Sequence, residues 1–146
     1  MTIKKSEYLK LDNQICFKLY TASRLFTQAY YSILEEMDLT YPQYLILLLL
    51  WEHESLTVKE LGKFLYLDSG TLTPLLKKME SKELVKRTRD KNDERSVKIT
   101  LTEKGEALSE KAENIPKEVA CKIDMEFSDA LMLHSLLEKL IPELKK

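Results

Sequence analysis

Two cysteines are the residues of this sequence best suited to chemistry. Cys16 and Cys121 lie far apart in the chain and form no CxxC pair. The two histidines lie near neither cysteine, so the pattern argues against both a zinc site and a disulfide framework. A thiolate is nevertheless a nucleophile that can be oxidised reversibly. Composition by itself favours two inert, buried thiols.

Basic residues gather in one segment of a chain whose net charge is −1. Residues 77–98 contain nine Lys or Arg and five Asp or Glu, whereas residues 103–129 contain four Lys and eight Asp or Glu. Most charge runs are solvated surfaces. A confined basic stretch is also typical of a surface that binds phosphates. Charge leaves both interpretations open.

Length and composition indicate a helix-rich globular domain. The chain has 146 residues, of which 44% are hydrophobic and 32% charged, with only three glycines. The longest apolar run, residues 44–51, falls short of the roughly 20 residues that a membrane span needs. Residues 1–14 lack the apolar core of a signal peptide. We therefore expect a cytoplasmic protein.

Apolar periodicity and capping patterns predict the helices that must position these residues. Apolar residues at three- and four-residue spacing predict a first helix over about 9–37. Thr40, Pro42 and Gln43 combine a cap, a first-turn proline and a capping-box partner, and they predict a central helix over about 44–52.

Two further helices and a hairpin follow. Thr57 with Glu60 repeats the capping-box pattern and opens a short helix, and Asp68 or Ser69 caps another that reaches about Lys82. After them, residues 84–89 and 95–101 read as strands, the second of which alternates polar and apolar residues around a charged tip.

The last third of the chain is helical again. A long helix is expected over about 103–125, which Pro116 should kink or restart, and Ser128 is expected to cap a last helix to about residue 144. A helix pair followed by a basic hairpin is the order of a winged helix-turn-helix. In that fold the second helix enters the major groove and the hairpin reaches a minor groove.

The expected fold is therefore mainly α, a winged helix-turn-helix with terminal helices forming a dimerisation layer. We expect a single domain over 1–146. Residues 38–102 would form its DNA-binding part, and residues 1–37 and 103–146 would supply the dimerisation helices.

Three motifs resemble MarR-family transcription regulators. Residues 67–80 resemble the recognition helix of that family, residues 93–95 (Asp-Glu-Arg) its wing tip, and residues 39–44 also match. The resemblance extends from about residue 11 to the end of the hairpin, and more loosely over the last two helices. It implies a homodimer without cofactor, not an enzyme, that binds a pseudo-palindromic DNA operator.

Within that family, residues 14–20 are similar to the first helix of the organic hydroperoxide resistance repressors. The resemblance implies that Cys16 is the thiol that reacts with peroxide. It places Tyr30 and Tyr41 of the partner subunit around that thiol, with Tyr20 nearby. Cys121 resembles the second cysteine of two-cysteine members. The resemblance therefore implies a disulfide between Cys16 and Cys121, and a bond between subunits is its expected form.

The physical reasons for reactivity are a helix terminus and hydrogen bonding. If Asp12 or Asn13 caps the first helix, Cys16 lies in its first turn, where the helix dipole favours the thiolate. Tyrosine hydroxyls would favour it further. In the alternative, Cys16 packs as a small apolar side chain and Cys121 is a buried helix residue.

The DNA-binding residues are expected on the recognition helix and the hairpin. Short hydroxyl side chains would reach base edges or phosphates, Lys side chains would contact phosphates, and Arg95 would enter a minor groove with Asp93 fixing its direction. Asp68 would act as the cap or contact cytosine. The full candidate set is Asp68, Ser69, Thr71, Thr73, Lys77, Lys78, Lys82, Arg87, Asp93 and Arg95.

Together these features predict a repressor that is released from DNA when Cys16 is oxidised by organic hydroperoxide. Three alternatives remain: a broader oxidation-sensing regulator, a MarR-type sensor of a small aromatic ligand, and a thiol peroxidase. Against the peroxidase, Cys16 lacks flanking Thr and Arg residues that would polarise a peroxide.

Overall fold

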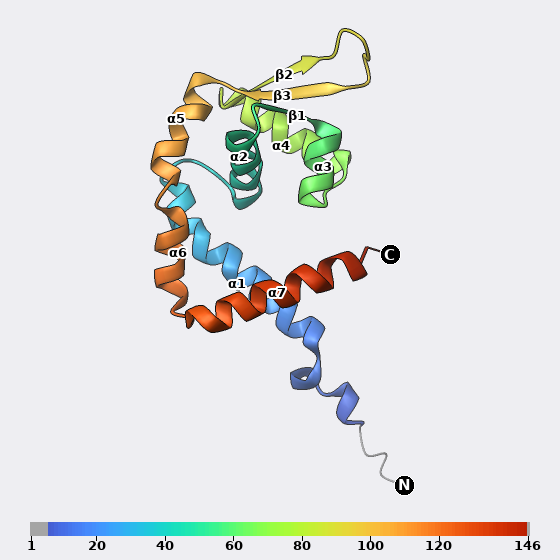
Figure 1. Ribbon diagram of the computed structural model, residues 1–146, viewed down its shortest axis with the longest axis vertical. Helices are drawn as coiled ribbons and strands as arrows, with labels where there is room; N and C mark the ends of the chain where they lie inside the picture. The colour runs from blue at the N-terminus through green and yellow to red at the C-terminus, as the bar shows by residue number, and fades with distance from the viewer. Residues whose placement is uncertain (1–5, 146) are drawn as a thin grey trace. The chain divides into compact units, whose positions relative to one another are not determined.

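The computed structural model describes residues 6–145, which divide into two compact units, the first ending at Glu113 and the second beginning at Asn114. Figure 1 shows the helices and strands of both. The first unit contains two short 3-10 turns, five helices and three strands: η1 Glu7–Leu9, η2 Leu11–Asn13, α1 Ile15–Glu35, α2 Tyr41–Glu52, β1 Ser55–Thr57, α3 Val58–Leu65, α4 Ser69–Ser81, β2 Val85–Arg89, β3 Val97–Leu101 and α5 Glu103–Ala112. The second contains α6 Ile115–Ile123 and α7 Phe127–Glu143.

The mainly helical winged fold is confirmed, and its sheet has one strand more than the sequence predicts. The three strands are antiparallel in the order β1-β3-β2, with Leu56 of β1 and Arg87 of β2 both paired to Ile99 of β3. The loop between β2 and β3 projects beyond the sheet, as a wing does (Figure 1). Three residues are too short to show strand periodicity, which is why β1 escaped detection.

The core of the first unit forms around α2. This helix is apolar nearly all round, and its side chains at positions 46, 47 and 50 are buried. The helix-turn-helix pair and the sheet pack against it, with fully buried side chains from α3, α4 and β3: Leu61, Leu72, Leu76, Met79 and Ile99. Burial of so much apolar surface fixes α4 and the wing relative to α2.

The predicted caps of α3 and α4 are confirmed. The Thr57 backbone N–H donates to Glu60 Oε2 at 2.7 Å, and the Glu60 N–H donates to Thr57 Oγ1 at 3.2 Å. The first of these bonds, followed by the Thr57 hydroxyl, lowers the pKa of Glu60. At α4, Asp68 Oδ1 accepts the Thr71 N–H at 2.7 Å.

The start of α1 differs from the prediction. The helix begins at Ile15 rather than near residue 9, because the two 3-10 turns precede it. Gln14 is its N-cap and makes no capping bond, so neither Asp12 nor Asn13 caps the helix. Asn13 instead donates its side-chain amide to the Glu7 carbonyl at 2.8 Å. The apolar spacing continues through these turns, which is why the pattern suggested a longer helix.

The C-terminal helices also differ in detail. The long helix expected over 103–125 is two helices, because the chain breaks after Ala112 and α6 restarts with Pro116 in its first turn. Ser128 does not cap the last helix, since α7 begins at Phe127 with Glu126 at its N-cap. Within residues 6–145, no helix is both long and apolar enough to cross a membrane.

Gly105 provides a stability test of the point where α5 meets the wing. A Cβ on Gly105 would lie 2.1 Å from the Leu84 carbonyl oxygen, whereas a Cβ on Gly70 would meet only the end of the Asp68 side chain at 3.1 Å. We predict that Gly105→Ala lowers the free energy of unfolding by about 1–3 kcal/mol, because backbone has to shift. Chemical denaturation would measure it.

Gly70→Ala is the matched control and should stay within about 0.5 kcal/mol of wild type, as a surface substitution. Equal stability of the two variants would contradict the close packing of α5 against Leu84.

Candidate nucleic-acid interface and thiol site

The first turn of α4 presents short polar side chains. Ser69 and Thr71 are exposed and Thr73 is half-buried, while the Asp68 carboxylate is engaged as the cap. The expectation that Asp68 caps the helix is therefore met. The exposed hydroxyls lie where a helix entering a groove meets base edges and phosphates.

The lysines in the last part of α4 and at its C-cap are of two kinds. Lys77 and Lys78 are exposed. Lys82, expected as a phosphate contact, instead lies with its Nζ 3.0 Å from the Asp38 carboxylate and donates to the Asp38 carbonyl oxygen. Asp38 is a left-handed residue in the turn between α1 and α2. Lys82 thus ties the end of the recognition helix to that turn.

Arg87 is also occupied within the chain. Its guanidinium lies 3.5 Å from Glu80 Oε2, and its backbone N–H donates to Glu80 Oε1 at 3.3 Å. Its Nε is buried without a hydrogen-bond partner. The residue therefore joins β2 to α4, a structural role beside the DNA contact expected from the sequence.

The wing tip presents Arg95. Asp93 Oδ1 accepts the Arg95 backbone N–H at 3.0 Å, and the Asp93 carbonyl accepts the Ser96 N–H at 2.9 Å. The expected side-chain pair is not formed, since among the described residues no ion pair joins Asp93 and Arg95. Asp93 shapes the backbone of the turn, and the exposed guanidinium of Arg95 stays available.

Cys16 is exposed in the first turn of α1. Although the predicted caps are absent, Cys16 is the second residue of a 21-residue helix and therefore lies among the unpaired N–H groups of the first turn. Cys121 is exposed in α6, in the second unit. Within its own unit, each thiol is therefore exposed, whereas the alternative interpretation expected buried ones.

Two of the three candidate tyrosines meet. The rings of Tyr30 on α1 and Tyr41 on α2 lie 4.8 Å apart between centroids. Burial raises the pKa of both phenols, and for Tyr30 the neighbouring Tyr41 raises it further. Both hydroxyls therefore keep their protons at neutral pH and can donate hydrogen bonds. Tyr20 is exposed on α1 and takes no part in this cluster.

Cys16 does not share a site with the tyrosines of its own chain. Cys16 and Tyr30 both lie on α1, and the residues between them at 1.5 Å each separate the two by about 21 Å. A helix keeps its two ends apart. The Tyr30 and Tyr41 pair can therefore surround a Cys16 thiolate only if that thiolate comes from another copy of the chain.

Tyr44 on α2 is a third member of the tyrosine cluster. It lies in the core, and its ring packs 5.9 Å from Tyr30 and 6.4 Å from Tyr41. The spacing of Tyr41 and Tyr44, three residues apart at the start of a helix, was the signal that could have shown this.

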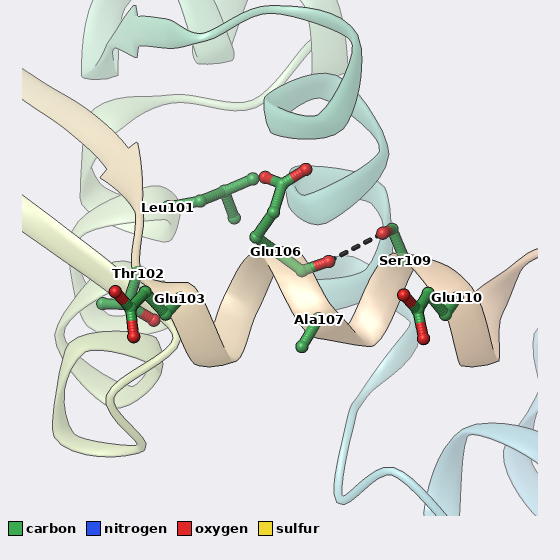
Figure 2. Close-up of a pocket in the computed structure, with 7 residues that line it drawn as sticks. All are labelled: Leu101, Thr102, Glu103, Glu106, Ala107, Ser109 and Glu110. Atoms are coloured by element: carbon green, nitrogen blue, oxygen red, sulfur yellow. Dashed lines mark hydrogen bonds between the residues drawn. The ribbon is translucent and has the colours of Figure 1, made fainter.

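An open groove on α5 carries only acidic and neutral side chains. Figure 2 shows its lining residues, with the Ser109 hydroxyl donating to the Glu106 carbonyl at 2.7 Å. The residues are Leu101, Thr102, Glu103, Glu106, Ala107, Ser109 and Glu110. Three carboxylates repel phosphate, so this groove is no part of a DNA interface. In the described part of the chain, no cluster of His, Cys, Asp and Glu could hold a metal ion.

Comparison with known proteins agrees with this geometry. The family model described as transcriptional regulator SarA/Rot matches residues 28–112. An organic hydroperoxide resistance transcriptional regulator of Bacillus subtilis is 51% identical over 140 residues, which cover 96% of this chain and 95% of that protein.

Solved structures of two regulators, AbfR and MarR, are also similar to this chain. Reduced AbfR bound to DNA has a TM-score of 0.78 at 37% identity, covering 97% of this chain and 99% of the other; AbfR is a Staphylococcus epidermidis protein. Reduced MarR from E. coli has a TM-score of 0.69 at 27% identity over 88% of this chain and 97% of its own.

These relatives are named as transcriptional regulators rather than enzymes, which confirms the expected class of protein and disfavours the thiol peroxidase. The resemblance to MarR regulators and to the organic hydroperoxide resistance repressors is likewise confirmed. The chain belongs to the SarA/Rot family of transcriptional regulators, with the winged-helix fold of MarR.

Proposed function

We propose that this chain is a homodimeric, cytoplasmic repressor that leaves its DNA operator when organic hydroperoxide oxidises Cys16. The observation that carries the proposal is the exposed Cys16 thiol in the first turn of α1, in a chain 51% identical to an organic hydroperoxide resistance regulator. A reducing cytoplasm would keep both cysteines as thiols until an oxidant arrives.

The proposed DNA interface consists of α4 and the wing. Ser69, Thr71 and Thr73 would meet the major groove, Lys77 and Lys78 the phosphates, and Arg95 a minor groove. Lys82 and Arg87 are left out, because Asp38 and Glu80 already hold them. Two copies related by a two-fold axis would bind a pseudo-palindrome.

Exposed apolar surface supports the dimer. No residue of α7 is buried, although the helix carries large apolar side chains that are more than half exposed at positions 127, 131, 132 and 136. On α1, Ile15, Tyr20 and Leu25 are exposed as well. Large apolar side chains left exposed on a helix with no buried residue are typical of an interface. The separation of Cys16 from its own tyrosine cluster requires a second copy for the same site.

The proposed chemistry starts with the thiolate. Cys16 Sγ attacks one peroxide oxygen, so that an S–O bond forms, the O–O bond breaks and the alcohol leaves after taking a proton. The hydroxyls of Tyr30 and Tyr41 from the partner subunit would stabilise the thiolate by hydrogen bonding, with Tyr20 nearby. The partner subunit's Cys121 thiolate then displaces hydroxide from the sulfenic acid, which forms a disulfide and, after protonation, water.

The states in which AbfR has been solved support a disulfide as the releasing step. One AbfR structure is described as disulfide-formed, and another as overoxidised and bound to DNA. The overoxidised state of AbfR is therefore compatible with a DNA complex of that protein. The bond to Cys121 is therefore the step that we expect to displace this chain from DNA.

The first test of the proposal is Cys16→Ser. The variant should bind operator DNA as tightly as wild type, because residue 16 lies outside α4 and the wing, and it should no longer respond to cumene hydroperoxide. DNA-binding titrations before and after stoichiometric treatment measure both properties. Release of the variant by the peroxide would place the sensing residue elsewhere.

Arg95→Ala tests the wing. Loss of the guanidinium should weaken operator binding by about 1–3 kcal/mol if Arg95 occupies a narrow minor groove. Lys78→Ala is the matched comparison: it should weaken binding to all sequences alike and reduce the salt dependence by about one unit. Unchanged operator affinity of Arg95→Ala, measured by fluorescence anisotropy, would remove the wing from DNA recognition.

The role of Cys121 is tested on non-reducing gels. After one equivalent of hydroperoxide, wild type should run as a covalent dimer that dithiothreitol reverses, because the two cysteines of a site come from two copies. Cys121→Ser should stop at the sulfenic acid. A monomeric band with an intrachain disulfide, found by mass spectrometry, would overturn the intersubunit bond.

A further inference from the structure

An aromatic row extends along α2 from the tyrosine cluster to the root of the wing. Tyr44 packs against Tyr30 and Tyr41 at one end of the helix, and its ring meets Trp51 edge to face at 6.5 Å. Residues 44 and 51 are seven positions apart and thus on the same face of the helix. All members of the row belong to the first unit.

The far end of the row is a hydrogen bond to α5. Trp51 Nε1 donates to the Gly105 carbonyl oxygen at 3.1 Å. Gly105 in turn lies so close to the Leu84 carbonyl that no side chain fits between them. Tryptophan is therefore joined to a segment of backbone that has no room to move independently.

That segment holds both strands of the wing. The carbonyl of Leu84, the residue before β2, accepts the N–H of Thr102, the residue after β3, at 3.1 Å. The Thr102 hydroxyl donates to the Glu83 carbonyl and accepts the Gly105 N–H at 3.0 Å. A displacement of Gly105 consequently displaces the ends of both strands.

The row is suited to transmit a displacement because it is closely packed. Tyr44 is only 3% exposed, and aromatic rings have few internal rotations through which to absorb a shift. Packed interiors transmit strain rather than dissipate it.

We propose that Tyr44 and Trp51 are positioning residues that couple the tyrosine cluster to the wing. The inference rests on the proposed function, in which Tyr30 and Tyr41 donate to the partner's Cys16 thiolate. Formation of the disulfide with Cys121 removes that acceptor, the two phenols lose their hydrogen bonds, and the altered cluster moves Tyr44. Trp51 passes the displacement to Gly105 and so to the strands that carry Arg95.

Trp51 is the one tryptophan of the sequence and reports on its own surroundings. In the full-length wild type, stoichiometric cumene hydroperoxide should change the intensity or wavelength of tryptophan emission. Cys16→Ser should show no change. An unchanged emission in wild type that has been oxidised and released from DNA would overturn the coupling, whereas the proposed function would stand.

Trp51→Phe tests the hydrogen bond while keeping an aromatic ring in place. Its measure is the ratio of operator affinity in the reduced and the oxidised protein. Loss of one hydrogen bond should reduce that ratio by about three- to tenfold, with Cys16 oxidised at the wild-type rate. A ratio equal to that of wild type would refute the role of Trp51.

Two further variants separate coupling from packing. Tyr44→Phe keeps the ring and should retain the wild-type ratio of operator affinities. Tyr44→Leu removes the ring and should reduce that ratio. Phe64→Leu is the matched control, because Phe64 stacks on His53 at 5.3 Å outside the row, and it should behave as wild type. The same loss in Phe64→Leu would show a general effect of packing and would contradict the row.

If wild type itself keeps its DNA after oxidation, the proposed function fails, and the coupling that rests on it fails with it. If wild type releases DNA and the Trp51 and Tyr44 variants do so equally, only the coupling fails. The two proposals therefore have separate outcomes.

Discussion

The length of α1 is the constraint on which the sensing site depends. One straight helix carries Cys16 in its first turn and Tyr30 in the latter part, about 21 Å away along the axis. The thiol and the phenols that could stabilise its anion are thus separated within each chain, and two copies are needed to bring them together. In the proposed function, dimerisation, sensing and the two-fold symmetry of DNA binding all follow from this geometry.

In the proposed function, α2 connects this site to the elements that bind DNA. Because α2 is apolar on nearly every side, α1, α3, α4, α5 and β3 all contact it. Its first turn supplies Tyr41 and Tyr44, and its last turn supplies Trp51 near the root of the wing. The reading elements and the tyrosine cluster are therefore parts of one packed unit, which is what a sensor that controls DNA binding requires.

Local patterns predicted much of this structure. The caps at Thr57 and Asp68 and the restart at Pro116 follow from residue type and spacing, and the structure has them. Tertiary pairings could not be predicted from local patterns. Lys82 has the sequence context of a phosphate-binding lysine, and only the fold shows its ion pair with Asp38, which is remote in sequence. The tyrosine roles came from family resemblance rather than spacing, since nothing local places Tyr30 against Tyr41.

The most direct test of the shared site is a mixed dimer. One chain carries Cys16→Ser, and the other keeps Cys16 but carries Tyr30→Phe and Tyr41→Phe. A site built from two chains leaves one Cys16 facing an intact tyrosine pair, so a purified mixed dimer should show fast sulfenic acid formation at about half the wild-type amplitude, as its single intact site requires. If thiol and tyrosines acted within one chain, no fast phase would remain, and that result would contradict the account.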